Sequence, residues 1–276
     1  MNIQWDDEAR EAVKKVPFFV RKRVKNRVES YVAGAGRSRV TLDDVHAVKK
    51  QYLENMEEEV RGYRVEGCFG PRGCPNRAGP HEDLASRLEA LLADKQLLAF
   101  LKSTVEGPLK FHHEFSVTIA ECPNACSRPQ IKDIGITGAA VPEITDESCT
   151  MCGACVDECK EGAVRINETI KKPEIDRAKC LDCGRCADVC PTKTISISRR
   201  AYKIMIGGKL GRHPRLAEPL PGLYDAVQVL DIVDRCVDFY KKYSTGGKRF
   251  AQLYAESSDG LMESLAGLIG QNEKGS

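Results

Sequence analysis

Twelve of the chain's thirteen cysteines lie between residues 68 and 190, at spacings that suit metal–sulfur chemistry. Two runs share the spacing C-x2-C-x2-C-x3-C and repeat after 31 residues. These runs are Cys149, Cys152, Cys155, Cys159 and then Cys180, Cys183, Cys186, Cys190. Four other cysteines, here called the core quartet, have a different spacing: Cys68, Cys74, Cys122 and Cys126. Thiolates are strong ligands for iron and zinc, so this pattern predicts metal or redox chemistry in a reducing compartment.

Disulfide scaffolds and zinc sites also concentrate cysteines, and the spacing argues against both. Disulfide scaffolds are typical of short secreted chains, whereas closely spaced C-x2-C pairs dominate here. A zinc ribbon uses two C-x2-C pairs and does not need the third and fourth cysteines of each run. In two-cluster ferredoxins, three cysteines of a run bind one [4Fe–4S] cluster and the fourth binds the other. The two runs therefore favour a ferredoxin-like insert over residues 140–199.

The ferredoxin rule assigns the ligands of two clusters. The first ferredoxin quartet is Cys149, Cys152, Cys155 and Cys190. The second ferredoxin quartet is Cys180, Cys183, Cys186 and Cys159. Pro191 follows the last cysteine as in bacterial ferredoxins, but Lys160 replaces the corresponding proline after Cys159. The cation at Lys160 is expected to raise the potential of the neighbouring cluster.

Helical periodicity dominates residues 1–60, which we expect to form a small helical domain. Five valines recur at three- and four-residue spacing: Val13, Val16, Val20, Val24 and Val28. Pro17 suits a first turn or a kink, and Gly34 and Gly36 are expected to end the helix. Thr41 and Asp44 predict a capping box for the next helix. The basic stretch 21–27 is interpreted as a solvated face, or as a docking surface for an acidic electron donor.

The rest of the chain alternates loops, strands and helices. Glycine and proline predict a loop around Cys68 and Cys74. We expect helices from Leu84, over 222–243 and from about 248, with Cys236 as a buried thiol. The expected strands are 115–119, 131–137 and 202–206, with one short strand after each cysteine run. The predicted fold class is α+β, with a reductase-like core made of residues 61–139 and 200–276.

Composition limits the partners. The charged fraction is 30% and the formal net charge is +2, so no nucleic-acid partner is expected. No run of about 18 apolar residues is present, which predicts no transmembrane helix. The first fifteen residues lack the apolar region of a secretory signal, so we expect a cytoplasmic protein.

The core quartet and the segments around it resemble siroheme-dependent sulfite and nitrite reductases. The residues that carry the resemblance are CFGPRGC, CPNACSRPQIKDIGITG and YKIMIGGKLGRHPRLA. Some dissimilatory and anaerobic members of that family carry a ferredoxin module at the same place. The resemblance implies a third [4Fe–4S] cluster on the core quartet and a siroheme whose iron shares the thiolate of Cys126. An ordinary cubane without heme is the alternative for these four cysteines.

Siroheme is a polycarboxylate and sulfite is an anion, so both require cationic or amide donors. For substrate, the resemblance implies catalytic roles for Arg72, Arg128, Lys209 and Arg212. For siroheme, beside Cys126, it implies Arg77, Lys132, Lys203, Arg215, and the backbone amides of Gly207 and Gly208.

The resemblance implies an anaerobic reductase that converts sulfite to sulfide, with nitrite as the neighbouring substrate. Electrons would come from a donor protein and enter at the insert. An alternative is a non-catalytic electron-transfer subunit without siroheme. A third alternative is a redox-sensing or assembly partner recruited through the basic helical segment.

The N-terminal segment departs from this family and resembles the small helical domain of light-independent protochlorophyllide reductase. It takes the place of the half-domain that siroheme reductases usually have before the first cluster cysteine. We therefore expect a homo-oligomer or a partner subunit to cover the exposed face of the heme.

Overall fold

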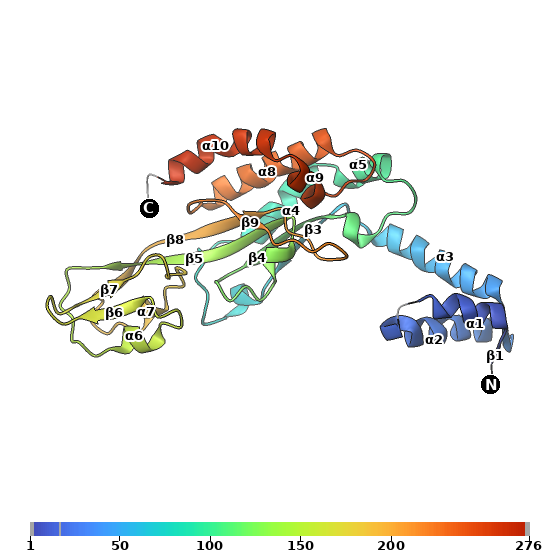
Figure 1. The fold of residues 1–276 in the computed structure, drawn as a ribbon, viewed down its shortest axis with the longest axis horizontal. Coiled ribbons are helices and arrows are strands. Elements are labelled where there is room, and N and C mark those ends of the chain that lie inside the picture. The colour runs from blue at the N-terminus through green and yellow to red at the C-terminus, as the bar shows by residue number, and fades with distance from the viewer. Residues whose placement is uncertain (1–2, 17, 274–276) are drawn as a thin grey trace. The chain divides into compact units, whose positions relative to one another are not determined.

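The computed structural model describes residues 3–16 and 18–273, whose contacts divide the chain into two compact units (Figure 1). One unit takes the residues up to Val60 together with Val105–His112. The other takes Arg61–Thr104 and the chain from His113 onward, so the insert and the reductase-like core belong to one unit. The three-domain division drawn from the sequence stays a prediction.

The first unit is mainly helical. Its elements are β1 (Gln4–Trp5), α1 (Asp7–Lys14), α2 (Phe18–Gly34), β2 (Arg39–Val40) and α3 (Leu42–Glu59). Val13 and Val28 of the predicted valine stripe are fully buried in one core, and Val24 packs against it. The stripe is divided between α1 and α2, and Val32, which was not predicted, joins the same core. Pro17 and the side chain of Val20 lie outside the described residues.

The predicted capping box of α3 is confirmed. The Thr41 amide donates to Oδ2 of Asp44 at 2.9 Å, and the Asp44 amide donates to Oγ1 of Thr41 at 3.3 Å. Arg37 adds a bidentate contact to the same carboxylate, at 2.6 and 3.2 Å. These bonds satisfy amides that a helix start leaves without partners.

The second unit is a mixed α+β structure, as predicted. Its strands are β3 (Tyr63–Gly67), β4 (Phe115–Ala120), β5 (Ile134–Ile144), β6 (Val164–Asn167), β7 (Lys172–Ile175), β8 (Ile195–Ile206) and β9 (Glu218–Pro219). Its α-helices are α4 (Leu84–Asp94), α5 (Leu97–Thr104), α6 (Ala154–Glu158), α7 (Arg185–Asp188), α8 (Ala226–Tyr243), α9 (Phe250–Glu256) and α10 (Asp259–Glu273). Short 3-10 turns, η1 and η3, span Gly70–Arg72 and Pro129–Ile131.

Five strands form the main sheet in the order β3-β4-β5-β8-β9. Strands β3, β4 and β5 run parallel, whereas β5 and β8 form a long antiparallel pair. Because β3 and β4 are parallel neighbours, their carboxyl ends meet at one edge of the sheet, and Cys68 and Cys122 follow those ends. The topology thus brings two cysteines 54 positions apart to one place.

Helices cover one face of this sheet (Figure 1). Phe115 of β4 stacks on Tyr240 of α8 with ring centroids 5.9 Å apart and meets Phe250 of α9 edge-on at 5.2 Å. Asp225 and Gln228 form a capping box at the start of α8. Cys236 is fully buried on α8, and burial raises the pKa of its thiol, so it is a core side chain.

Two strand predictions need correction. Strand β5 begins at Ile134 rather than 131, because residues 129–131 form the turn η3, and it continues to Ile144. The second cysteine run is not followed by a separate short strand: Ile195 and Ile197 belong to β8, which continues without interruption into the core. No glycine or proline interrupts 195–206, so one strand satisfies both segments.

The insert follows β5, and the chain returns to the core along β8 (Figure 1). Strands β6 and β7 form an antiparallel hairpin, and α6 and α7 are short helices within the two cysteine runs. None of the helices described in the structure has the length and hydrophobicity needed to span a bilayer.

Candidate functional site

The strand ends position the core quartet. The Cys68 amide donates to the carbonyl oxygen of Ile119 at 3.0 Å, which holds the first residue after β3 to the end of β4. The turn η1 places Cys74, whose amide donates to the carbonyl oxygen of Gly70 at 3.2 Å. Cys126 lies in the loop before η3, and this loop is held to β4 because Ser127 Oγ donates to the carbonyl oxygen of Ile119 at 2.8 Å.

The four thiols of the core quartet lie near one another. Burial raises the pKa of Cys122, and the neighbouring thiols raise it further; these neighbours are Cys68, Cys74 and Cys126. Exposure differs across the quartet, because Cys122 is 8% exposed whereas Cys126 is on the surface. Cys126 is therefore the member of the core quartet that is accessible from solvent.

The eight cysteines of the insert lie in two groups of four. Each group has three cysteines from one run and one from the other, as expected of a two-cluster ferredoxin. Burial raises the pKa of Cys155, with further contributions from the other members of the first ferredoxin quartet, Cys190, Cys149 and Cys152. Burial raises the pKa of Cys186 to about 12, with contributions from the rest of the second ferredoxin quartet, Cys180, Cys183 and Cys159. Each quartet therefore combines cysteines of both runs, and each lines its own pocket.

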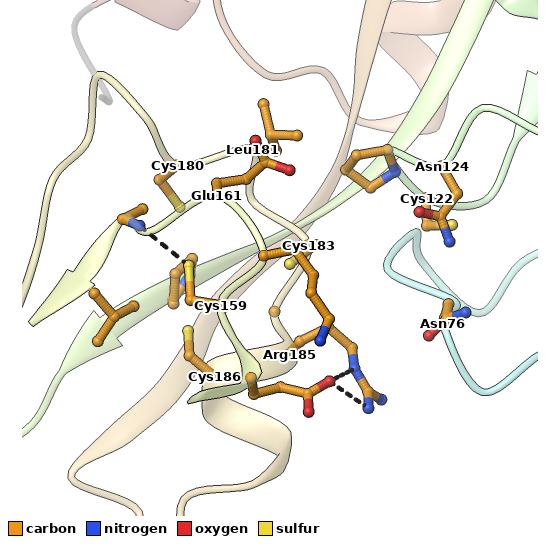
Figure 2. Close-up of a pocket in the computed structure, with 17 residues that line it drawn as sticks. Asn76, Cys122, Asn124, Cys159, Glu161, Cys180, Leu181, Cys183, Arg185 and Cys186 are labelled. Atoms are coloured by element: carbon orange, nitrogen blue, oxygen red, sulfur yellow. Dashed lines mark hydrogen bonds and ion pairs between the residues drawn. The ribbon is translucent and has the colours of Figure 1, made fainter. Parts of the chain in front are cut away.

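The second ferredoxin quartet lies beside the core quartet. Its four thiols line a cavity of about 260 Å³, and Cys122 lies on the wall of the same cavity. Figure 2 shows the insert cysteines on one side of this space and Cys122 with Asn124 on the other. The first ferredoxin quartet lines a separate pocket without any core residue. The second quartet is therefore the one adjacent to the core.

Backbone amides point at several of these sulfurs. Cys68 Sγ accepts from the amides of Gly70 and Glu121, each at 3.3 Å. In the insert, Met151 donates to Cys149 at 3.3 Å and Ala163 donates to Cys159 at 3.2 Å. Such donors stabilise a thiolate over a thiol, which suits ligands of an iron–sulfur cluster.

Burial raises the pKa of Cys190, but hydrogen bonds from Ile195, Thr192 and Thr194 outweigh that effect and lower the pKa below its ordinary value.

All thirteen cysteines are free of disulfides in the structure. Within the part of the chain that the structure describes, no three His, Cys, Asp or Glu side chains converge as ligands of a single ion do. The thiolates of a cubane each bind a different iron, so they are spaced more widely than the ligands of one ion.

The eight predicted cations fall into two groups. Four are paired with the protein's own carboxylates: Arg77 with Glu121, Lys132 with Glu66, Lys203 with Asp182 and Arg215 with Glu218. These are the four cations expected to hold siroheme. No ion pair to a described residue joins the four expected to hold substrate, Arg72, Arg128, Lys209 and Arg212. Of those, Lys209 is half-buried and the other three are exposed, so their charges remain available to an anion.

Packing accounts for Gly207 and Gly208. A Cβ on Gly207 would lie 2.4 Å from the ring of Tyr254, and Gly207 also has a left-handed φ of 82°. A Cβ on Gly208 would lie 2.5 Å from the carbonyl oxygen of Gln130. The structure therefore explains both glycines through close approach within the chain, and their contact with siroheme stays a prediction.

Sequence reasoning missed Glu121, which directly precedes Cys122. Its carboxylate pairs with Arg77 at 3.0 Å, and both side chains are largely buried, at 8% and 16% exposed. Burial raises the pKa of Glu121, and Arg77 partly opposes that effect. Gly70 and Gly79 lack side chains because Glu121 occupies the space beside them. The available signal was an acidic residue directly before the first cysteine of CPNAC, whereas its burial against Arg77 and Gly70 depends on the fold.

Asp182 was also missed. It stands between two members of the second ferredoxin quartet, with a left-handed φ of 56°, and its Oδ1 lies 3.7 Å from Cys180 Sγ. Burial raises the pKa of Cys180, and the charge of Asp182 raises it further.

Comparison with known families agrees with this geometry. The family model described as the nitrite and sulphite reductase 4Fe-4S domain matches residues 64–257. The chain belongs to this family. Membership makes it an iron–sulfur protein of the oxidoreductase type, related to sulfite and nitrite reductases, and confirms the resemblance read from the cysteine motifs.

Two curated relatives of this family member are sulfite reductases. The coenzyme F420-dependent sulfite reductase of Methanocaldococcus jannaschii is 35% identical over 137 residues, which cover 50% of this chain and 22% of that protein. A subunit of the anaerobic sulfite reductase of Salmonella typhimurium is 28% identical over 138 residues, covering 45% of this chain and 36% of that subunit. The chain therefore spans well under half the length of these relatives.

The fold and the N-terminal segment have relatives of their own. The crystal structure of dissimilatory sulfite reductase I matches with a TM-score of 0.51 and 15% identity, covering 81% of this chain and 57% of that chain, which supports a shared fold. The model described as proto-chlorophyllide reductase 57 kD subunit matches residues 5–49. One subunit of the light-independent protochlorophyllide reductase of Heliobacterium modesticaldum is 48% identical over 50 residues, covering 18% of this chain and 10% of that subunit.

Proposed function

We propose that the chain is the siroheme- and iron–sulfur-binding part of a reductase that converts sulfite to sulfide. The adjacency of the second ferredoxin quartet and Cys122 across one cavity is the observation that carries this proposal. Two relatives are sulfite reductases, which favours sulfite over nitrite as the substrate.

Each quartet is proposed to hold one [4Fe–4S] cluster, so the chain would carry three. When bound, the clusters would supply single electrons and siroheme would supply the iron at which sulfite is reduced. The role of the chain's own residues would be to bind and orient the clusters and the siroheme. The core quartet would hold one cluster at the carboxyl ends of β3 and β4, with Cys126 as its exposed ligand.

Four cations would bind the anionic substrate: Arg72, Arg128, Lys209 and Arg212. Guanidinium and ammonium groups stabilise negative charge on sulfite and on its reduction products. Because the four lack carboxylate partners among the described residues, an anion does not have to displace an existing ion pair.

A partner completes the proposed enzyme. This chain covers 36% of one relative that is itself named a subunit. The first unit resembles a protochlorophyllide reductase segment rather than a siroheme-covering half-domain. We therefore propose that a second copy or another subunit covers the siroheme beside Cys126, and that a donor protein supplies electrons at the first ferredoxin quartet.

Anaerobic purification followed by visible spectroscopy and a sulfite assay with a reduced dye tests this function. Siroheme bands together with sulfide release are the expected result. Full iron and acid-labile sulfide without a macrocycle would instead identify an electron-transfer subunit. Turnover of nitrite but not of sulfite would reassign the substrate and leave the cofactors in place.

A further inference from the structure

Lys203 projects from core strand β8 to the loop that holds the second ferredoxin quartet. Its Nζ lies 2.8 Å from Oδ2 of Asp182 and donates to the carbonyl oxygen of Leu181 at 3.4 Å. Both partners lie between Cys180 and Cys183. The sequence predicted that Lys203 would contact a siroheme carboxylate, whereas in the structure this cation is bonded to the cluster loop.

The carboxylate of Asp182 faces a cluster sulfur on its other side. Oδ1 of Asp182 lies 3.7 Å from Cys180 Sγ, where a protonated thiol donates to it. A cysteine that binds iron is a thiolate and has no proton to donate. The carboxylate would then be next to a negative sulfur, so a nearby cation becomes electrostatically important.

The two copies of the repeat differ in charge at the position of Asp182. Position 151 in the first run corresponds to position 182 in the second, and both have a left-handed backbone, with φ values of 59° and 56°. Met151 occupies this place between two cysteines of the first ferredoxin quartet, whose pocket contains no core residue, and its exposed side chain carries no charge. Left-handed backbone favours aspartate over methionine and thus accounts for Asp182 itself. It does not account for a lysine supplied by the core.

Stability alone does not explain the pair. The Lys203 and Asp182 side chains are 36% and 17% exposed, and an ion pair of that kind adds little to folding stability. The loop is already attached to β5, because the Ala140 amide donates to the carbonyl oxygen of Asp182 at 2.7 Å. Arg177, 4.0 Å from Oδ1 of Asp182, is a second cation near this carboxylate.

We infer that Lys203 is a positioning residue that neutralises Asp182 and thereby raises the reduction potential of the cluster on the second ferredoxin quartet. This inference rests on the proposed function, since it needs a cluster at that quartet. A cation near a cluster favours its reduced, more negative state, and an unpaired carboxylate disfavours it. Met151 gives the first ferredoxin quartet no such charged pair.

Redox titrations followed by electron paramagnetic resonance test the inference on the full-length protein with reconstituted clusters. The signal lost in Cys183→Ala identifies the cluster concerned. Lys203→Gln is expected to lower the midpoint potential of that signal and leave the first ferredoxin cluster unchanged. Lys203→Arg should retain the wild-type potential, and Asp182→Asn combined with Lys203→Gln should return it toward wild type.

Lys242→Gln on α8 is the matched control, because it removes one exposed lysine charge without touching the insert. Equal potentials in Lys203→Gln and Lys242→Gln, with equal iron and sulfide contents, would overturn the inference. A shift of both insert clusters together would also overturn it, since that indicates a general structural change. Wild-type protein that shows no [4Fe–4S] signal from this quartet would contradict the proposed function instead.

Discussion

Ala140 of core strand β5 forms a β-bridge with Cys183, a member of the second ferredoxin quartet. Through this bridge, the loop that contains Cys180 and Cys183 pairs with β5 of the main sheet. The position of the second ferredoxin quartet relative to the core is therefore set by backbone hydrogen bonding as well as by side chains. A rigid connection of this kind keeps the distance between two redox sites constant.

Substitution of Gly184 tests this connection. A Cβ at Gly184 would lie 2.8 Å from the Cβ of Ala140, and the residue has a φ of 75°. Gly184→Ala should cost about 1–2 kcal/mol for the left-handed backbone and about 1–3 kcal/mol more for overpacking. Gly153 is its counterpart in the repeat, with a φ of 76° and open space around it. Gly153→Ala should therefore show the backbone cost alone.

The measurement is hydrogen exchange of amides in β5 and in the second cysteine run. We expect faster exchange at Ala140 and Cys183 in Gly184→Ala than in Gly153→Ala. Identical exchange in the two variants would contradict the proposed docking role of Gly184.

The ion pair between Arg77 and Glu121 should be important for stability. Both side chains are largely buried, and loss of one partner leaves an uncompensated charge, which costs about 3–5 kcal/mol. Glu121→Ala should lower the denaturant midpoint and the yield of the core cluster. Glu89→Ala breaks a more exposed pair with Arg61, at 36% and 63% exposed, and should cost at most about 1 kcal/mol. An equal loss of stability in the two variants would show that the burial of an ion pair does not affect its contribution to stability.

Asp44 should make the helical unit sensitive to acid. The guanidinium of Arg37 lowers the pKa of Asp44 below its ordinary value. A carboxyl whose folded pKa is depressed stabilises the fold above its unfolded pKa, and that contribution is lost as the pH falls through the folded pKa. The protection of α3 amides, corrected for the intrinsic exchange rate at each pH, should therefore fall below about pH 4, the ordinary aspartate range.

Asp44→Ala should destabilise α3 by about 1 kcal/mol near neutral pH and remove this acid dependence. Asp43→Ala, in the same helical turn but exposed, is the control. An unchanged acid dependence in Asp44→Ala would assign the effect to other groups.

Cys126 separates siroheme binding from the other clusters. Cys126→Ser should remove the siroheme bands and sulfite turnover while the resonance signals of the two insert clusters persist. Cys236→Ala, which changes a buried thiol on α8, should keep the siroheme bands at reduced stability. Turnover that survives Cys126→Ser would contradict the shared sulfur.

The sequence predicted what depends on local spacing and could not predict what depends on long-range register. The two runs, the capping box of Thr41 and the helix α8 all follow from residues close together in the chain. The adjacency of Cys122 to the second ferredoxin quartet depends instead on the pairing of β5 with β8. Similarly, Lys203 is one cation among several in the sequence, and only the β8 register brings it to Asp182.

Chemical analysis of the wild-type protein, purified without oxygen, tests the central claim most directly. Iron, acid-labile sulfide and extracted siroheme are to be quantified per chain. We predict three [4Fe–4S] clusters and one siroheme, with the siroheme lost in Cys126→Ser. Two clusters with no siroheme, and a core quartet that titrates as four free thiols, would contradict the claim.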